Sequence, residues 1–496
     1  MLVAVVASAT TAVAVVASEP TRRSATLVQS SIAGDRLTKK APITLGQCKN
    51  PSMHNVVTIN ETATLHKIAG FGGAFTQSAA QIFAEASADM KAQLIDLYFG
   101  EHGHRYTLGR VPIGSCDFSP RHYTYAEQPD DVTLSKFSLH HDFPTLVPLL
   151  RAAKAAVNRD GGERLKLVAS PWSAPAWMKK NNNYRCPLDP LCFGCTLRDE
   201  YLPTWALYMR RYVDGYSALG LAPWAITVQN EPENCPNNYE GMHWSAAGQR
   251  DFIRDHLGPA LNGTGTLLLA YDHNKDHLPE WADAILADPA AAVHVAGLAF
   301  HWYSGAQFDR IAEVHRKFPD ALLLATEAAE GGDHNFSTMP SWQMGEHYSS
   351  DIIGDLVAGA SGWIDWNLFL EPGRQRDGFH FGPQHYNPFP DFGGNNAMLV
   401  VDNAEGRIWP QAFYWHMGHF SRYMRPGAVV LHTDCGTSTM ISCVAARNPD
   451  GSIVLVTLNT GAVEARYEVC LVGSRPSAVR GFNFTSPAHS IQTVIL

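Results

Sequence analysis

The 496-residue chain lacks several features that would place it in well-defined classes. It has no run of basic residues and a net charge of -9, so we expect no nucleic-acid partner. Beyond the amino terminus no apolar stretch is long enough to cross a bilayer, and we expect no transmembrane anchor. No internal repeat or low-complexity tract is present. With 45% apolar and 17% charged residues, the composition is typical of a globular protein.

The amino terminus and four acceptor motifs favour the secretory pathway. Residues 2–18 are apolar and small, end in residues that suit a signal-peptidase cut before Glu19, and are too few to span a membrane comfortably. A signal peptide usually has a Lys or Arg before its apolar run, but none precedes this one. We nevertheless predict a signal peptide over residues 1–18. Asn-x-Ser/Thr motifs predict glycosylation at Asn60, Asn262, Asn335 and Asn483.

The nine cysteines indicate disulfides. Cys435 and Cys443 flank a segment that suits a hairpin, and we predict that they are bridged. Four others gather around a Pro- and Asn-rich insertion: Cys186, Cys192, Cys195 and Cys235. Zinc is the alternative for these four, but no second C-x-x-C pair or suitably spaced His follows, so we expect no metal and leave their connectivity open. Nine is odd, and Cys116 is the candidate for a free thiol.

Strand-like and helical patterns alternate through the middle of the chain. The strand-like runs cover residues 68–75, 105–113, 165–172, 224–231, 267–272, 295–303, 322–327 and 362–367. Helical patterns cover 88–99, 143–157, 202–218, 246–261 and 308–318. Eight alternations predict an α/β fold, a (β/α)8 TIM barrel over residues 67–415. A doubly wound sheet is the alternative, but Gly70, Gly72 and Gly73 do not fit its phosphate loop and open no clear helix.

The pattern of apolar residues changes after residue 416. Short apolar or alternating runs follow one another, with N-P-D-G as a turn between two of them, and predict a β-sandwich over residues 416–496. Residues 41–66 are also strand-like before the barrel begins, and we expect the V-V-T-I-N segment to join the same sandwich. The additional domain is therefore built from both chain ends, with 19–66 as its amino-terminal part. Residues 19–40 are polar and are expected to be flexible.

Two of the strand-like runs stop on an acid. W-A-I-T-V-Q-N is followed by Glu231, and A-L-L-L-A-T is followed by Glu327. A barrel enzyme keeps its chemistry at the carboxyl ends of its strands, so the two carboxylates would face each other across one pocket. Paired carboxylates of this kind cleave glycosidic bonds. The alternative is that they are surface acids. Glu233 and Glu330 lie a few residues past the strand ends, and we interpret both as loop carboxylates.

Further polar and aromatic residues stand at the strand ends and suit a sugar site. With the two acids, the set comprises Arg110, Asp117, Trp172, Asn230, Glu231, His301, Tyr303, Glu327, Trp366 and Asn367. One acid must be protonated, with a raised pKa, to release the leaving oxygen, while the other must be ionised to attack the anomeric carbon. Asn230 is positioned to hold the sugar 2-hydroxyl. Tyr303 is expected to donate to the nucleophilic carboxylate and keep it ionised.

Long strings of the sequence resemble glycoside hydrolase family 30, and within it the glucosylceramidase type. These strings are F-G-G-A-F-T-Q-S-A-A (71–80), R-V-P-I-G-S-C-D-F-S (110–119), Y-T-Y-A-E-Q-P-D-D (123–131), A-S-P-W-S-A-P-A-W-M-K (169–179), Q-R-D-F-I (249–253), H-W-Y (301–303), W-I-D-W-N-L (363–368) and G-H-F-S-R-Y (418–423). They stand in order and extend the resemblance over roughly residues 45–496.

The resemblance implies a role for each site residue. It makes Glu231 the acid/base and Glu327 the nucleophile of a retaining β-glucosidase acting on glucosylceramide at a membrane surface. It places these residues around the glucose: Arg110, Asp117, Trp172, Asn230, His301, Tyr303 and Trp366, with Tyr239 on the fourth loop. It implies no cofactor, a lysosomal or secreted location, and a lipid-presenting activator protein as a partner to consider.

The chain departs from the family at two loops and at its cysteines. Residues 371–396 are longer than the family's loop, and the family's usual Asn there corresponds to Asn395 or Asn396. The insertion at 181–195 is distinctive, and the amino-terminal cysteine knot of the animal enzymes is represented at most by Cys48. Phe389 and Phe392 either line an apolar rim for ceramide or pack the loop onto the barrel.

Three alternative functions stand beside the glucosylceramidase interpretation. The first is a family relative that acts on β-1,6-glucan or xylan. The second is a transglucosidase in which a sterol accepts the sugar, and the third is a non-catalytic sugar-binding protein.

Overall fold

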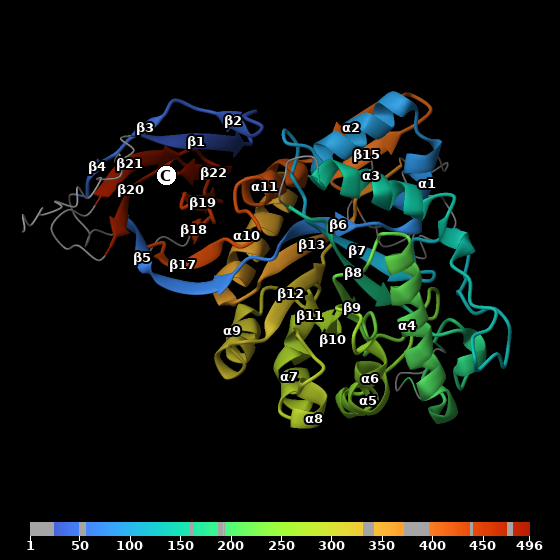
Figure 1. Cartoon of the computed structure of the whole chain (residues 1–496). Helices are drawn as coiled ribbons and strands as arrows, with labels where there is room; N and C mark the ends of the chain where they lie inside the picture. Colours follow the sequence, from blue (N-terminus) through green and yellow to red (C-terminus); the bar gives the residue numbers. More distant parts are fainter. Residues whose placement is uncertain are drawn as a thin grey trace, which may run out of the picture.

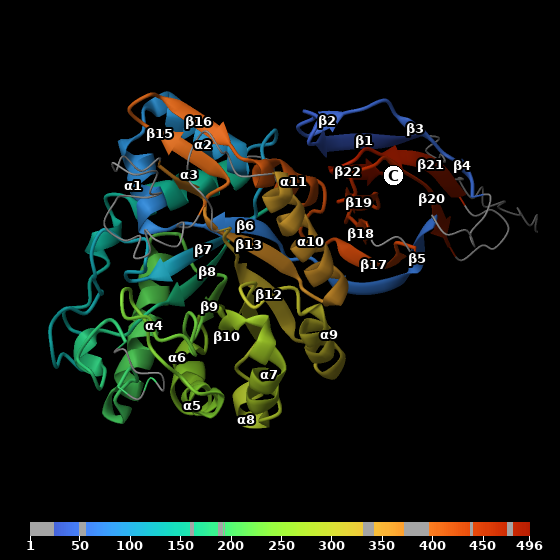
Figure 2. The ribbon, with the colours of Figure 1, turned by 180° about the vertical axis from the view of Figure 1, so that it is seen from behind.

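The computed structural model describes residues 24–48, 56–158, 163–186, 192, 194–330, 342–371, 396–436, 440–473 and 480–496. It contains two bodies, a strand barrel surrounded by helices and a β-rich domain beside it (Figure 1). Helices α10 (Trp342–Ala358) and α11 (Ala412–Ser421) lie between them, as the view from behind also shows (Figure 2). Strand β18 packs on α10 and strand β22 on α11. No helix in these ranges is long and apolar enough to span a membrane.

Eight parallel strands close into the predicted barrel. They are β6 (Gly70–Ala74), β7 (Leu108–Ile113), β8 (Lys166–Pro171), β9 (Ala225–Thr227), β10 (Leu267–Asn274), β11 (Gly297–His301), β12 (Leu322–Glu327) and β13 (Gly362–Asn367). Strand β13 pairs with β6 and completes the ring. These strands are buried on both faces, which explains why they are continuous apolar runs. The predicted fold class is confirmed.

Helices follow most strands and cover the outside of the barrel. They are α1 (Gln77–Glu85), α2 (Ala88–Phe99), α3 (Leu146–Asn158), α4 (Leu202–Ala218), α5 (Ala246–Phe252), α6 (Gly258–Leu261), α7 (Leu278–Leu286), α8 (Pro289–Ala292) and α9 (Phe308–Lys317). The patterns at 88–99 and 202–218 match α2 and α4 to the residue. Helix α1 was not predicted. It begins directly after β6, where the Thr76 hydroxyl accepts from the Ala79 N–H and caps the helix.

The second domain is an extensive antiparallel sheet with strands from both chain ends. Its order is β2-β1-β22-β19-β18-β17-β5-β20-β21-β4, with β3 paired to β1, and β5 runs parallel to β20. The amino-terminal strands are β1 (Ser24–Ser31), β2 (Thr38–Lys39), β3 (Ile43–Thr44), β4 (Gly46–Gln47) and β5 (Val56–Lys67). The others are β17 (Val429–Asp434), β18 (Ile441–Arg447), β19 (Ile453–Asn459), β20 (Ala465–Val472), β21 (Arg480–Ser486) and β22 (Ser490–Ile495). A small sheet of β14 (Phe369–Leu370), β15 (Leu399–Asp402) and β16 (Arg407–Pro410) lies against α1.

The prediction that residues 19–40 are flexible is wrong for the part that the structure describes. Strand β1 lies inside the sheet, paired with β22 along six residue pairs. Its polar residues are buried because they have hydrogen-bond partners. The Ser30 hydroxyl lies 2.9 Å from His419 Nε2 and accepts from the Leu37 N–H. Such a strand has no hydrophobic pattern by which the sequence could reveal it.

Four disulfides link the cysteines. Cys435 is bonded to Cys443, the pair that the sequence predicts, and Cys48 to Cys470. In the insertion, Cys186 is bonded to Cys195 and Cys192 to Cys235, while Cys116 is a buried free thiol. Among the proposed glycosylation sites, Asn262 and Asn483 are exposed. Asn60 is half-buried, its Oδ1 accepts from Thr62, and Asn335 lies outside the described residues.

A buried histidine on α11 predicts that stability falls in acid. Burial, together with the charge of Arg36, lowers the pKa of His416 to about 3, and its Nε2 has no hydrogen-bond partner among the described residues. The unfolded chain protonates this imidazole near pH 6.5, so the folded state binds fewer protons below that pH and loses stability. Between pH 7 and 5 this amounts to about 2 kcal/mol. We expect His416→Asn to lose correspondingly less stability over that range in thermal or urea unfolding. The exposed His102→Asn is the control, and an unchanged pH dependence in His416→Asn would contradict the prediction.

Candidate active site

The strands present the predicted site residues to one mouth, at the carboxyl ends of the barrel strands. Arg110 is on β7, Trp172 follows β8, and Asn230 and Glu231 follow β9. His301 ends β11, Glu327 ends β12, and Trp366 is on β13. This is the end at which barrel enzymes carry out their chemistry. Hydrogen bonds connect Arg110, Asn230, Glu231, His301 and Glu327 into one network, and the two tryptophans lie against Arg110.

Arg110 is the centre of the network and is completely buried. Its Nη1 donates to Glu327 Oε2, and its Nη2 donates to Asn230 Oδ1 at 2.7 Å and to Asp272 Oδ2 at 2.8 Å. Nε donates to the Ser170 hydroxyl at 3.3 Å. A buried guanidinium requires such partners because an unpaired buried charge is strongly destabilising. Arg110 therefore sets the positions of a carboxylate on β12 and of the amide that precedes Glu231.

Glu327 receives donors on both of its oxygens. Besides the bond from Arg110, Oε1 accepts from the Tyr303 hydroxyl at 2.9 Å. Burial raises the pKa of Glu327, and the positive charges of His301 and Arg110 act in the opposite direction. Tyr303 itself is 42% exposed, so the ring stands at the open side of the site. Donors of this kind stabilise the ionised form of the carboxylate, as the sequence analysis expected of Tyr303.

Asp272, at the end of the fifth predicted strand, is a site residue that the sequence analysis missed. It is fully buried and accepts from four side chains: Arg110, His301, Thr227 and Thr326. Burial opposes its charge, but Arg110 and His301 hold its pKa well below the usual range. The missed signal was available, because the run L-L-L-A-Y-D also stops on an acid.

The backbone around Asp272 is irregular, and two successive side chains are directed into the site. Tyr271 and Asp272 have φ angles of 70° and 72°, and the pairing of β10 with β11 shifts between Tyr271 and His273. Positive φ at non-glycine residues costs about 1–3 kcal/mol each and is found mainly at functional sites. The bulge breaks the alternation of the strand, so that Asp272 and the next residue both lie in the site.

His301 connects the two sides of the site. Its Nε2 lies 3.1 Å from Asp272 Oδ1, and its Nδ1 lies 3.4 Å from Glu231 Oε1. Burial alone would lower the pKa of His301, but the carboxylates of Glu327, Asp272 and Glu231 outweigh it and raise the pKa to about 9. The His301 imidazole is therefore cationic at neutral pH. Both of its nitrogens are protonated, and each donates to one carboxylate, Nε2 to Asp272 and Nδ1 to Glu231.

The pKa of Glu231 is lowered, whereas the sequence analysis expected the catalytic acid to have a raised pKa. Burial would raise its pKa, but the hydrogen bond to His301 and the charges of His273 and His301 lower it to about 2. Its Oε2 accepts from Asn234 Nδ2 at 2.9 Å, and the same amide donates to the Tyr239 hydroxyl at 2.8 Å. Glu231 has a φ of 48°, and its N–H donates to the Asp272 carbonyl. The titratable proton nearest the Glu231 carboxylate thus resides on His301.

The two tryptophans lie beneath Arg110, and almost none of their surface is exposed. Trp172 and Trp366 are 2% and 1% exposed and stack at 5.2 Å between ring centroids. The Arg110 guanidinium lies 4.8 Å from the Trp172 ring. Asp117 is half-buried, and its Oδ1 has no hydrogen-bond partner among the described residues. Burial and the charges of Glu327, Glu240 and Glu231 raise its pKa well above the usual range. A buried carboxylate oxygen without a partner is a candidate for contact with a ligand.

The remaining candidate residues lie outside the hydrogen-bond network. Glu233 pairs with His277 and Glu330 with His347, as suits loop carboxylates. Asn367 accepts from Thr76. Asn396 is buried and accepts from Gln411, whereas Phe389, Phe392 and Asn395 lie outside the described residues.

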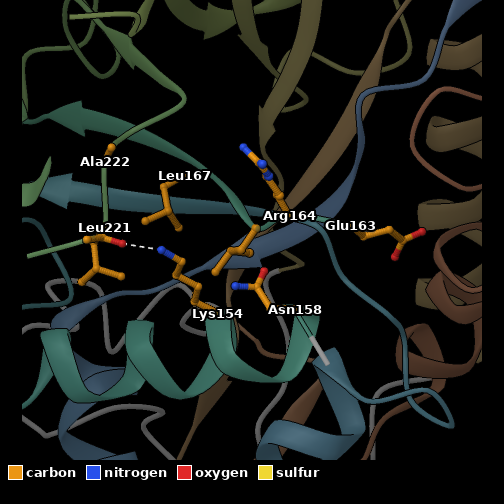
Figure 3. A pocket seen from close by; sticks show the side chains of 9 residues that line it. Lys154, Asn158, Glu163, Arg164, Leu167, Leu221 and Ala222 are labelled. Atoms are coloured by element: carbon orange, nitrogen blue, oxygen red, sulfur yellow. Dashed lines mark hydrogen bonds between the residues drawn. The ribbon is translucent and has the colours of Figure 1, made fainter. Parts of the chain in front are cut away.

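A cavity of about 730 Å³ lies at the opposite end of the barrel (Figure 3). It is lined by α3, by the residues that enter β8, and by Gly220–Ala222 before β9. Lys154 donates to the Gly220 carbonyl at 2.5 Å, and Glu163 accepts from Arg425. The amino-terminal end of a barrel contributes to stability rather than to chemistry. The acidic mouth is therefore the candidate site.

Comparison with known proteins agrees with this architecture. The model described as "Glycosyl hydrolase family 30 TIM-barrel domain" matches residues 68–424, and "Glycosyl hydrolase family 30 beta sandwich domain" matches residues 427–494. The mouse "Lysosomal acid glucosylceramidase" is 35% identical over 454 residues, 89% of this chain and 83% of the mouse protein. The Trichoderma harzianum "Endo-1,6-beta-D-glucanase BGN16.3" is 30% identical over 443 residues, 85% of this chain and 83% of that protein. The crystal structure of SrfJ from Salmonella typhimurium superposes with a TM-score of 0.84 at 30% identity, covering 95% of this chain and 99% of SrfJ.

Proposed function

Since this chain belongs to glycosyl hydrolase family 30, we propose that it is a retaining β-glucosidase that hydrolyses glucosylceramide to glucose and ceramide. The observation that carries the proposal is the contrast between two carboxylates in one site. Glu327 accepts from Arg110 and Tyr303, whereas Glu231 contacts a protonated imidazole and an amide. Two donors thus stabilise negative charge on Glu327 against the burial that raises its pKa, and Glu231 lies beside a proton on His301.

We assign the nucleophile to Glu327. Its two donors, Arg110 and Tyr303, stabilise the negative charge of the carboxylate and orient it. Attack of an oxygen of Glu327 on the anomeric carbon would form a glycosyl ester and break the bond to the leaving oxygen. Water would then hydrolyse the ester and restore the β configuration. Arg110 is buried and stays charged throughout. It can therefore stabilise the Glu327 carboxylate both before attack and when the ester is hydrolysed.

We assign the acid/base role to Glu231. The leaving oxygen must receive a proton, and His301 holds one 3.4 Å from Glu231 Oε1. Because the groups interact strongly, Glu231 and His301 are expected to titrate as a coupled pair rather than independently. Once Glu327 has become an ester, its negative charge is lost, which favours the ionised form of Glu231. That form is the base required to activate water in the second step.

We assign the sugar-binding groups from the site residues whose donor or acceptor atoms remain available for a hydrogen bond. Asp117 Oδ1 has no partner among the described residues and would meet a glucose hydroxyl. The side-chain oxygen of Asn230, Oδ1, accepts from Arg110. This orients the side-chain amide so that its NH2 group is available to the sugar 2-hydroxyl. Trp172 and Trp366 would form the floor of the sugar pocket, and Tyr239 and Tyr303 its sides. A hydroxyl that fails to match such groups costs about 1–3 kcal/mol.

The lipid aglycone is supported by similarity to the mouse lysosomal enzyme, whose name states its activity. We expect the chain to act in the secretory pathway, in the lysosome or after secretion, on lipid at a membrane surface. A lipid-presenting activator protein is a candidate partner. The Trichoderma relative favours a second candidate, cleavage of β-1,6-glucan. Both names state cleavage of a glucosyl linkage, so the two candidates differ in what the rim of the site would accept.

Side-by-side assays distinguish the two candidates. The purified protein is incubated with glucosylceramide in anionic-lipid micelles, with β-1,6-glucan and with xylan, and released sugar is quantified. We expect glucose from the lipid at a kcat/KM at least about 100-fold above that for either polysaccharide, because an exo-acting pocket has little space for a second sugar beyond the non-reducing end. Faster cleavage of a polysaccharide would replace the proposal with the second candidate. Adding a sterol to the lipid assay tests for a glucosyl-sterol product.

A further inference from the structure

His273 has no assigned role in the proposed hydrolysis, yet it lies in the site beside Glu231 and His301. These three side chains each offer one ligand atom, and the three atoms lie within 4.8 Å of one another. His273 is half-buried, and its Nδ1 is buried with no hydrogen-bond partner among the described residues. An imidazole nitrogen without a partner in a polar site is available to a ligand.

The arrangement suits a transition-metal ion. Glu231 Oε1 and His301 Nδ1 are 3.4 Å apart, and two atoms bound to one tetrahedral zinc ion at about 2.1 Å are separated by about the same distance. The His273 and His301 rings stand at 80°, with centroids 6.4 Å apart, so both can turn an edge to a common centre. The other nitrogen of His301 is held by Asp272 at 3.1 Å. A carboxylate behind a metal-binding histidine is the usual support for such a ligand.

The charge of the surroundings also favours a cation. Asp272 and Glu327 face His301 in addition to Glu231, and Arg110 is the buried cation that they share. These carboxylates stabilise positive charge on the imidazole, and they would equally stabilise a divalent ion in its place. Glu231 is 13% exposed at its side chain, which leaves a route from solvent. Two imidazoles and one carboxylate suit zinc and not magnesium or calcium, which prefer oxygen ligands.

We propose that Glu231, His273 and His301 bind a divalent cation of the zinc type, and that the bound ion inhibits the hydrolase by occupying the Glu231 carboxylate. The inhibition rests on the proposed function of Glu231, whereas the binding does not. Two other clusters of potential ligands in the described part of the chain include Cys192 with Cys235 and Cys48 with Cys470. Their sulfurs are joined in disulfides and are not available to a metal.

The test compares zinc binding by isothermal titration calorimetry in wild type, His273→Gln and His277→Gln. His277 is the matched control, since its imidazole is 57% exposed and pairs with Glu233, a neighbouring carboxylate outside the proposed site. We expect one zinc ion per wild-type chain at this site, at least about 30-fold weaker binding in His273→Gln, and affinity within about twofold of wild type in His277→Gln. Magnesium at millimolar concentration should not compete.

Inhibition is measured on a soluble aryl β-glucoside, with each variant compared with its own metal-free rate. The zinc concentration for half-inhibition should follow the dissociation constant and rise at least about 30-fold in His273→Gln. Equal zinc affinity in wild type and His273→Gln, with both proteins folded by thermal unfolding, would overturn the site. Binding at His273 without inhibition would overturn the inhibitory role. If the metal-free enzyme cleaves no glucoside at all, the proposed function fails, while the calorimetry still decides the metal site.

Discussion

Glu327→Gln is expected to reduce kcat on every β-glucoside by about 10⁴-fold or more, because the anion that attacks the anomeric carbon is lost. Glu231→Gln should reduce kcat comparably on substrates with poor leaving groups. On dinitrophenyl β-glucoside, which needs no proton to depart, the Glu231 variant should instead release a burst of dinitrophenolate and then turn over slowly, since the second step lacks its base. Stopped-flow absorbance separates the burst from steady-state turnover.

The loop carboxylates provide matched controls for this pair. Glu233→Gln and Glu330→Gln remove an acid close in sequence, but each partner is a histidine outside the network around Arg110. We expect both variants to keep kcat within a few-fold of wild type. Full activity of Glu327→Gln on dinitrophenyl β-glucoside would sink the assignment of the nucleophile. An α-anomer as the first product in NMR would exclude retention.

Asp272→Asn is expected to damage both stability and activity, although this residue need not touch the substrate. Oδ2 accepts from Arg110 and Thr227, while Oδ1 accepts from His301 and Thr326. An amide has only one oxygen, so whichever way it is turned its NH2 group meets two donors. Two buried cations, Arg110 and His301, also lose one of their counter-charges. We expect about 3–5 kcal/mol less stability and at least a 100-fold loss of kcat/KM.

Urea unfolding and steady-state kinetics check this second result. Asp255→Asn is the control, because Asp255 is exposed and paired with Arg254 on the surface, and it should change stability by less than about 0.5 kcal/mol. Thr326→Val removes one donor and should have a smaller effect of the same kind, which separates positioning from general loss of fold. Wild-type kinetics in a folded Asp272→Asn protein would show that the network does not position Arg110 and His301.

The low pKa of Glu231 illustrates what a pattern of residues cannot convey. The sequence places an acid after the fourth strand, and the chemistry of glycosidases led us to expect a raised pKa. The value depends instead on His301 and His273, which come from two other strands and contribute positive charge. Electrostatic interactions of this kind depend on distances between distant parts of the chain, which become available only with the fold.

The sequence by itself determined the barrel and the positions of its two acids. Strands buried on both faces must be apolar throughout, so the runs ending at Glu231 and Glu327 are recognisable locally, as is the periodicity of α2 and α4. Tertiary structure alone decided the burial of β1, the pairing of Cys192 with Cys235, and the contacts that make Asp272 a site residue. The physical reason is that polar groups are buried only where partners from distant segments meet them, and no local pattern records those partners.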